Sequence, residues 1–188
     1  SKETLFFAVN GHYSYITDIF FFVVTEAGNT WTYIGLILLS LFLPRRYTIM
    51  LLIALLISSL AAQGLKHSLF ENYLRPLAYF PDASLVHHLK WSQELRFHSM
   101  PSGHATSVFA WVTCTVLYLN RQKYDLLFLL LALLAAYSRV YLGQHFTGDV
   151  VAGSAIGIVS AHVAQYFTNQ FESTTWFNIP FVQGWFGK

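Results

Sequence analysis

The chain has 188 residues, of which 55% are hydrophobic and 11% are charged, whereas soluble domains carry about 25% charged residues. This composition excludes water as the main solvent and predicts an integral membrane protein. The formal net charge of +2 is too small and too scattered for a nucleic-acid-binding surface, which needs a dense basic patch.

The N-terminal part of the chain is predicted to lie at the membrane surface. Residues 13–25 are apolar and aromatic, but they contain Asp18 and are followed by Glu26, which favours an interfacial helix over a spanning one. A short apolar stretch follows at 31–43. It reaches the length of a span only if its helix extends back through Gly28.

Four further stretches have the character of transmembrane helices, which need about 20 mainly apolar residues. They cover residues 47–65, 102–119, 126–141 and 150–167. The sequence therefore predicts an all-α integral-membrane helical bundle with about five transmembrane helices plus an N-terminal interfacial helix. After the last span, aromatic residues alternate with polar ones, which is typical of an interfacial tail; they are Trp176, Phe177, Phe181, Trp185 and Phe186.

Basic connections between the spans predict the orientation of the bundle. The two shortest polar breaks, 44–46 and 120–123, are both basic, and short basic connections favour the cytoplasm. Counting crossings from there brings segments 66–76, 100–104 and 138–149 together at the opposite face. Ionisable residues at the ends of spans are costly unless they serve a site or reach water, so we expect the chemistry at this face.

Three cations reach the face where these segments meet: Lys66, Arg75 and Arg139. Together they can neutralise a phosphate group, and arginine adds the bidentate geometry that phosphate oxygens accept. The alternative is that these long side chains only snorkel to the headgroup layer.

The run from Pro101 to His104 precedes an apolar stretch, and Ser102 is a good N-cap for that helix. Backbone N–H groups at a helix N-terminus form an anion site. Gly103 has no side chain, so an anion can approach these groups closely. His104 then lies in the first turn beside the anion. Capping alone explains the serine and the glycine but does not require a histidine.

His145 and Asp149 are four residues apart and can share one helix face. A carboxylate that accepts the Nδ1 proton leaves the Nε2 lone pair free for nucleophilic attack; the alternative is a pair that only ties down a helix end. The same face continues through Gly153, Gly157 and Ala161, small residues that let membrane helices approach closely. The site is therefore expected inside the bundle.

These motifs resemble those of the type 2 phosphatidic-acid phosphatase and vanadium haloperoxidase superfamily, in its bacterial membrane lipid-phosphatase branch. The family motifs are Lys then Arg-Pro, Pro-Ser-Gly-His, and Ser-Arg followed by His and Asp. They correspond here to Lys66 with Arg75-Pro76, Pro101 to His104, and Ser138-Arg139 with His145 and Asp149. The family usually places fewer residues between Lys and Arg than the eight, 67–74, found here. Extra loop residues cost little entropy, so the ammonium can still reach the phosphate.

The composition predicts one domain over 1–188 with interfacial segments at 1–30 and 168–188, and the resemblance implies a catalytic core at 47–167. It also implies the role of each motif residue. Lys66, Arg75, Ser102, Gly103 and Arg139 hold phosphate, His145 attacks, Asp149 orients His145, and His104 protonates the leaving oxygen.

The activity implied by the resemblance is metal-independent and cofactor-free. It is hydrolysis of a terminal phosphate from a phospholipid, isoprenyl diphosphate or lipid A type substrate through a phosphohistidine. The expected partners are this membrane lipid phosphate and the bilayer, with no nucleic acid. The expected location is the bacterial inner (cytoplasmic) membrane, with the site facing the periplasm or exterior.

Two other functions use the same residues. A lipid phosphotransferase shares every motif and differs only in its acceptor. A non-catalytic carrier of anionic lipid needs the cations but has no need for two histidines and a paired carboxylate. A haloperoxidase is expected to be soluble, which the composition excludes.

Five residues outside the motifs are candidates for metal binding or for structural roles. His87, His88 and His98 lie on the outer loop, but no acidic or cysteine ligand spacing accompanies them, so no metal site is predicted. The single cysteine, Cys114, is expected to be a buried thiol. His162 is expected to be a satisfied polar residue within the bundle.

Overall fold

The computed structural model describes residues 1–183, which form helices joined by loops and contain no β-strand. Trp185 and Phe186 of the predicted interfacial tail lie outside the described residues. The helices are α1 (Lys2–Asn10), α2 (Tyr15–Thr25), η1 (Glu26–Gly28), α3 (Thr30–Ser40), α4 (Arg45–His67), α5 (Pro76–Tyr79), η2 (Ala83–Leu85), α6 (Gly103–Leu119), α7 (Gln122–Tyr141), α8 (Thr147–Asn169) and η3 (Thr175–Asn178).

The all-α membrane bundle predicted from the sequence is confirmed. Helices α4, α7 and α8 are long and apolar enough to cross a membrane, while α3 and α6 are shorter apolar helices. The four predicted spans fall within α4, α6, α7 and α8 or within one residue of their ends. Helix α6 ends at Asn120 with a left-handed backbone (φ 47°), which reverses the chain into α7.

Close contact between α6 and α8 forms the centre of the bundle. A Cβ atom at Gly153 would lie 2.4 Å from the carbonyl oxygen of Ser102, and one at Gly157 would lie 2.4 Å from that of Thr106. Ala161 continues the same face and is fully buried. The small-residue stripe therefore packs backbone against backbone, as the sequence predicts, and α4 covers both helices.

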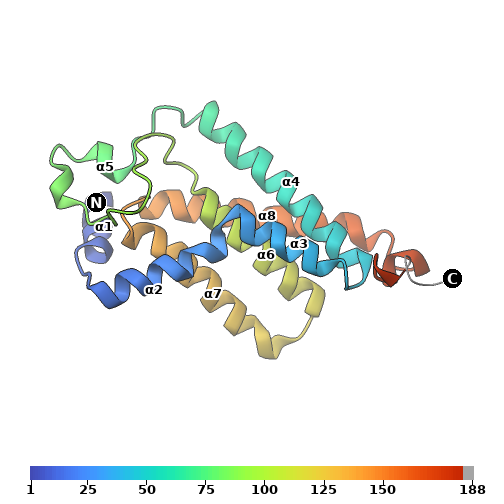
Figure 1. Ribbon diagram of the computed structural model, residues 1–188. Coiled ribbons are helices and arrows are strands. Elements are labelled where there is room, and N and C mark those ends of the chain that lie inside the picture. Colours follow the sequence, from blue (N-terminus) through green and yellow to red (C-terminus); the bar gives the residue numbers. More distant parts are fainter. Residues whose placement is uncertain (184–188) are drawn as a thin grey trace.

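Different helices and connections lie at the two ends of the bundle, as Figure 1 shows. Helix α1, helix α5 and the long connection from α4 to α6 gather at one end, while the α6–α7 connection and the last described residues lie toward the other. Arg45 and Arg46 belong to this second end, where Arg45 donates to the Trp176 carbonyl and Arg46 pairs with Glu172. The predicted meeting of segments 66–76, 100–104 and 138–149 thus occurs at the first end.

Helix α2 packs along α7 instead of standing apart from the bundle. With η1 and α3 it forms an interrupted helical path that runs beside the other helices (Figure 1). Asp18, which suggested a surface helix, is buried on the side of α2 that faces α7. The acidic residue therefore has a protein partner and does not itself require the headgroup layer.

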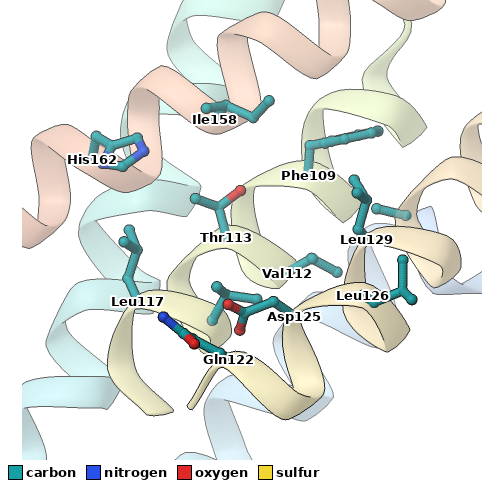
Figure 2. Close-up of a pocket in the computed structure, with 12 residues that line it drawn as sticks. Phe109, Val112, Thr113, Leu117, Gln122, Asp125, Leu126, Leu129, Ile158 and His162 are labelled. Carbon is teal, nitrogen blue, oxygen red and sulfur yellow. The ribbon is translucent and has the colours of Figure 1, made fainter. Parts of the chain in front are cut away.

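A crevice of about 570 Å³ lies between α6, α7 and α8, and Figure 2 shows its lining. Its wall is mainly apolar, with Gln122, Asp125 and His162 among the polar members. His162 is exposed on α8, so the prediction that it is satisfied inside the bundle is wrong. None of the motif residues lines this crevice, so the site lies elsewhere.

Candidate active site

A tight loop between α7 and α8 carries His145. The N–H groups of Gln144 and His145 both donate to the carbonyl of Arg139, at 3.0 and 3.2 Å. Gly143 has φ +68°, and a Cβ atom there would lie 2.6 Å from the His87 carbonyl oxygen, so only glycine fits without strain. The loop turns His145 inward, where the side chain is 2% exposed.

The two ring nitrogens of His145 face different groups. Nε2 lies 3.3 Å from Nη1 of Arg75. Because a guanidinium has only donors, Nε2 must be the acceptor, which leaves the ring proton on Nδ1. Nδ1 lies 3.4 Å from Oδ2 of Asp149, within ion-pair range but without hydrogen-bond geometry. The tautomer that this contact selects is the one a nucleophilic Nε2 needs.

The surroundings of His145 keep its imidazole neutral. Burial lowers the pKa of His145 well below its ordinary value, and the positive charges of Arg75, Arg139 and Lys66 act in the same direction. The backbone carbonyl of Ser99 opposes them by favouring a proton on the ring. A neutral ring retains a lone pair, so the residue is in its nucleophilic form at neutral pH.

Arg75 is a buried cation held between two loops. Its Nε donates to the carbonyl of Phe97 at 3.0 Å, and its Nη1 donates to the carbonyl of Gln144 at 3.2 Å. Burial lowers the pKa of Arg75 to about 10, which leaves it charged at neutral pH. A fixed guanidinium beside Nε2 can receive a phosphate oxygen at the point of attack.

Asp149 joins the start of α8 to the chain just before α6. Its Oδ2 accepts from the Phe146 N–H at 2.9 Å and from the Ser99 hydroxyl, and its backbone carbonyl accepts from the Ser102 N–H at 2.9 Å. The carboxylate is thereby fixed beside His145. Ser99 was not identified from the sequence; its only signal is a hydroxyl two residues before the Pro-Ser-Gly-His motif.

The start of α6 meets the end of α4 at this site. Ser102 caps α6 with its hydroxyl, which accepts from the Ala105 N–H at 3.5 Å. A Cβ atom at Gly103 would have Lys66 Nζ as its nearest neighbour, at 4.0 Å. The ammonium therefore reaches the helix N-terminus despite the longer connection between Lys66 and Arg75. His104 follows in the first turn and packs its backbone against Gly28.

Arg139 lies near the end of α7 and is 7% exposed. Its Nη1 donates to the hydroxyl of Thr25 at 2.7 Å, and its Nε has no hydrogen-bond partner within residues 1–183. Thr25 was not identified from the sequence, because nothing in its neighbourhood distinguishes it from other helix-end hydroxyls. The structure thus gathers all eight predicted site residues at one end of the bundle.

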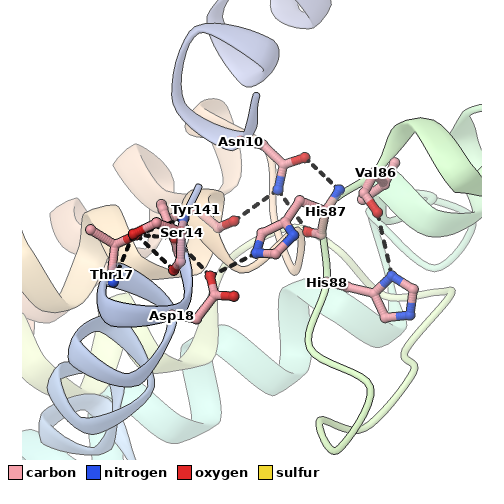
Figure 3. Close-up of polar contacts among 8 residues, drawn as sticks. All are labelled: Asn10, Ser14, Thr17, Asp18, Val86, His87, His88 and Tyr141. Atoms are coloured by element: carbon pink, nitrogen blue, oxygen red, sulfur yellow. Dashed lines mark hydrogen bonds and ion pairs between the residues drawn. The ribbon is translucent and has the colours of Figure 1, made fainter. Parts of the chain in front are cut away.

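A polar cluster braces the His145 loop from the N-terminal side, and Figure 3 shows its hydrogen bonds. Asp18 Oδ1 lies 2.8 Å from Nε2 of His87 and accepts from the Tyr141 hydroxyl at 2.7 Å. Asn10 donates to the carbonyls of His87 and Tyr141 and accepts from the His87 N–H. The cluster therefore ties α1 and α2 to the outer loop and to the last residue of α7, just before Gly143.

Two of the outer-loop histidines lie close to carboxylates. His87 pairs with Asp18, and His88 lies 3.7 Å from Glu94. Over residues 1–183, no group of three His, Cys, Asp or Glu side chains is placed to hold a metal ion. Cys114 is fully buried in α6, as its apolar surroundings predict.

Comparison with known proteins adds a family and a fold. The model of the PAP2 superfamily matches residues 47–172. The chain is 26% identical over 171 residues to a lipid A 4'-phosphatase of Porphyromonas gingivalis, covering 86% of this chain and 70% of that protein. It is 33% identical over 107 residues to a lipid A 1-phosphatase of Rhizobium etli, covering 55% of this chain and 45% of that protein.

Two solved structures share the fold. Aquifex aeolicus LpxE aligns with a TM-score of 0.78 and 24% identity, covering 87% of this chain and 94% of that one. A PAP2-type phosphatidylglycerolphosphate phosphatase from Bacillus subtilis aligns with a TM-score of 0.68 and 21% identity, covering 92% and 87%. At 24% and 21% identity, the structural similarity shows a shared fold and nothing more.

Proposed function

This chain belongs to the PAP2 superfamily, and we propose that it is a membrane lipid phosphatase that works through a phosphohistidine on His145. The observation that carries the proposal is the setting of this imidazole. Arg75 lies 3.3 Å from Nε2 and Asp149 lies 3.4 Å from Nδ1, inside a buried pocket of cations. A carrier without chemistry has no need of an oriented, neutral histidine at its anion site.

Binding places the phosphate between the cations and the start of α6. Arg75, Arg139 and Lys66 neutralise the phosphate oxygens, and the N–H groups that follow Ser102 donate from the helix N-terminus. Charge stabilisation of this kind acts most strongly on the transition state, when negative charge builds up on those oxygens.

Hydrolysis then takes two steps. In the first, Nε2 of His145 attacks phosphorus, the bond from phosphorus to the lipid oxygen breaks, and His104 gives its proton to that oxygen. In the second, His104 takes a proton from water, the water oxygen attacks phosphorus, and the phosphorus–nitrogen bond breaks. Inorganic phosphate leaves, and His145 returns to its starting state with its proton still on Nδ1 beside Asp149.

The names of the relatives and the position of the basic residues in the bundle support a proposal for the substrate and the location. Both curated relatives act on lipid A by name, so a lipid A type phosphate is the first substrate to test. We place the chain in the bacterial inner membrane with the site toward the periplasm or exterior, because Arg45 and Arg46 lie at the end opposite the site. Single cysteines at Gln93 and Gln122 should label from opposite sides; labelling of Gln122 in intact cells would reverse the orientation.

Trapping the intermediate tests the mechanism. Purified enzyme is mixed briefly with substrate labelled in its phosphate, and acid-labile, base-stable label on the protein is counted. Wild type and the exposed-loop control His12→Ala should both be labelled, whereas His145→Ala should be unlabelled and inactive. Wild-type labelling of His145→Ala would remove His145 as the nucleophile.

The partner histidine should fail differently. His104→Ala keeps the nucleophile but loses the acid of the first step and the base of the second. With a good leaving group, this variant should form the phosphoenzyme and hydrolyse it slowly. Loss of labelling in His104→Ala with such a substrate, equal to that of His145→Ala, would contradict the assigned role.

A further inference from the structure

Gln144 is a buried polar residue that directly precedes the proposed nucleophile, and its side chain has no part in the mechanism described above. The residue is 4% exposed. A buried amide is costly unless its donor and acceptor groups find partners. The partners of this side chain therefore indicate what it does beside His145.

The chemistry of its neighbours fixes the orientation of the Gln144 amide. The amide nitrogen donates to the Ser92 hydroxyl and to the Gln93 carbonyl, both at 3.3 Å. The amide oxygen, Oε1, accepts from Nη1 of Arg75 at 3.5 Å. A carbonyl can only accept and a guanidinium can only donate, so the reverse orientation of the amide would lose both of these contacts. The side chain thus links the outer loop to Arg75.

Three acceptors surround Nη1 of Arg75, which carries only two protons. They are the backbone carbonyl of Gln144 at 3.2 Å, Nε2 of His145 at 3.3 Å and Oε1 of Gln144 at 3.5 Å. When one proton goes to the backbone carbonyl, Nε2 and Oε1 share the other. The Gln144 side chain is therefore an alternative acceptor to the nitrogen that attacks phosphorus.

The lone pair on Nε2 of His145 must be free when attack begins. While Nη1 of Arg75 donates to Nε2, that lone pair is occupied. Moving the proton to Oε1 of Gln144 frees the lone pair, and Arg75 is still held by the carbonyls of Phe97 and Gln144. A buried N–H group left without an acceptor is costly. The second acceptor therefore lowers the cost of this shift.

From this geometry, and resting on the proposed phosphohistidine mechanism, we infer that Gln144 is a positioning residue whose side chain draws the Arg75 proton away from the attacking nitrogen. It acts through Arg75 and not on the phosphate itself. The outer loop takes part, because Ser92 and Gln93 hold the amide with its oxygen toward Arg75. The effect is confined to the first step, since Nε2 is bonded to phosphorus in the second step and cannot accept from Nη1.

Gln144→Met tests this inference, because methionine fills a similar space without an amide. After rapid mixing with saturating substrate labelled in its phosphate, the phosphoenzyme should form about five- to tenfold more slowly than in wild type, as loss of one hydrogen bond predicts. Loss of label during a chase with unlabelled substrate measures the second step, and inhibition by inorganic phosphate measures binding. Both should stay close to wild type. Gln165→Met, the same change near the far end of α8, is the matched control and should leave all three quantities unchanged.

A second variant leaves Gln144 in place. Ser92→Ala removes one acceptor of the amide nitrogen, so it should slow phosphoenzyme formation by about two- to threefold and should add nothing to the effect of Gln144→Met.

The outcomes separate the inference from the proposed function. Phosphoenzyme formation at the wild-type rate in Gln144→Met or in Ser92→Ala would overturn the inference. Equal losses in both steps and in phosphate binding would also overturn it, because that is the result expected if Gln144 only braces the outer loop. Wild-type enzyme that takes up no label would instead refute the phosphohistidine mechanism on which the inference rests.

Discussion

Asp18 offers a test of how the first 30 residues support catalysis. It lies outside the matched family region, yet it accepts hydrogen bonds from His87 and Tyr141 with only 13% of its side chain exposed. Hydrogen bonds to a charged group contribute about 1.5–3 kcal/mol each. Asp18→Asn keeps the shape and one acceptor but removes the charge, so we expect a loss of about 2–4 kcal/mol in the free energy of unfolding.

Turnover should fall as well, because the cluster supports the loop that carries the nucleophile. The His87 carbonyl contacts Gly143, and Tyr141 directly precedes that loop. Loosening these contacts displaces His145 from its position near Arg75, so kcat should drop about tenfold or more while KM changes little. The two measurements are thermal unfolding in detergent and phosphate release at saturating substrate.

Asp82→Asn provides the matched control, since Asp82 is an exposed carboxylate at the same end of the molecule and, among the described residues, bonds to Ser84 alone. It should leave both quantities close to wild type. If Asp18→Asn lost stability but retained wild-type kcat at a temperature where it is fully folded, the cluster would hold the fold together without positioning His145.

Three further predictions concern packing, metal and pH. Gly157→Ala should destabilise the bundle by about 1–3 kcal/mol because its Cβ meets the backbone of Thr106, whereas Gly64→Ala meets nothing within 4 Å; equal melting temperatures would contradict this. Activity should survive EDTA and be inhibited by vanadate; rescue by magnesium after chelation would refute a metal-free site. Because burial holds the pKa of His145 below its usual 6.5, the unfolded state alone takes up a proton as pH falls below 6.5. Below pH 6.5 the wild-type protein should therefore lose roughly 1.4 kcal/mol of unfolding free energy per pH unit relative to His145→Gln. Acid melting curves that fall in parallel for the two proteins would disprove this.

The parts of the structure that can be predicted from the sequence are those that depend on patterns between residues close together in the chain. Hydrophobic stretches mark α4, α6, α7 and α8, and the spacing of Gly153 and Gly157 marks the face of α8 that contacts α6. Counting crossings brings the motif segments to one end without any knowledge of their contacts. Those features depend on composition and helical period, which a single sequence displays directly.

The remaining features depend on partners far apart in the chain. Asp18 suggests a surface helix when read alone, because its partners His87 and Tyr141 are 69 and 123 residues away. Ser99 and Thr25 likewise become recognisable only when Asp149 and Arg139 are placed against them. His162 shows the opposite error: it was predicted to lie inside the bundle but is exposed. Helical period alone does not decide whether a residue of α8 faces the bundle or its surface.

The need to bury cations explains why the N-terminal segment belongs to the site. A phosphate site inside a helical bundle requires guanidinium groups out of water, and each buried charge is costly unless hydrogen bonds accompany it. Thr25 supplies one for Arg139, while Asn10 donates to the carbonyls of Tyr141 and His87, which lie beside Gly143. These contacts come from α1 and α2, before the matched region begins at residue 47. A chain shortened to the matched region would keep every motif residue, but it would leave Arg139 without its hydroxyl partner and the His145 loop without its brace.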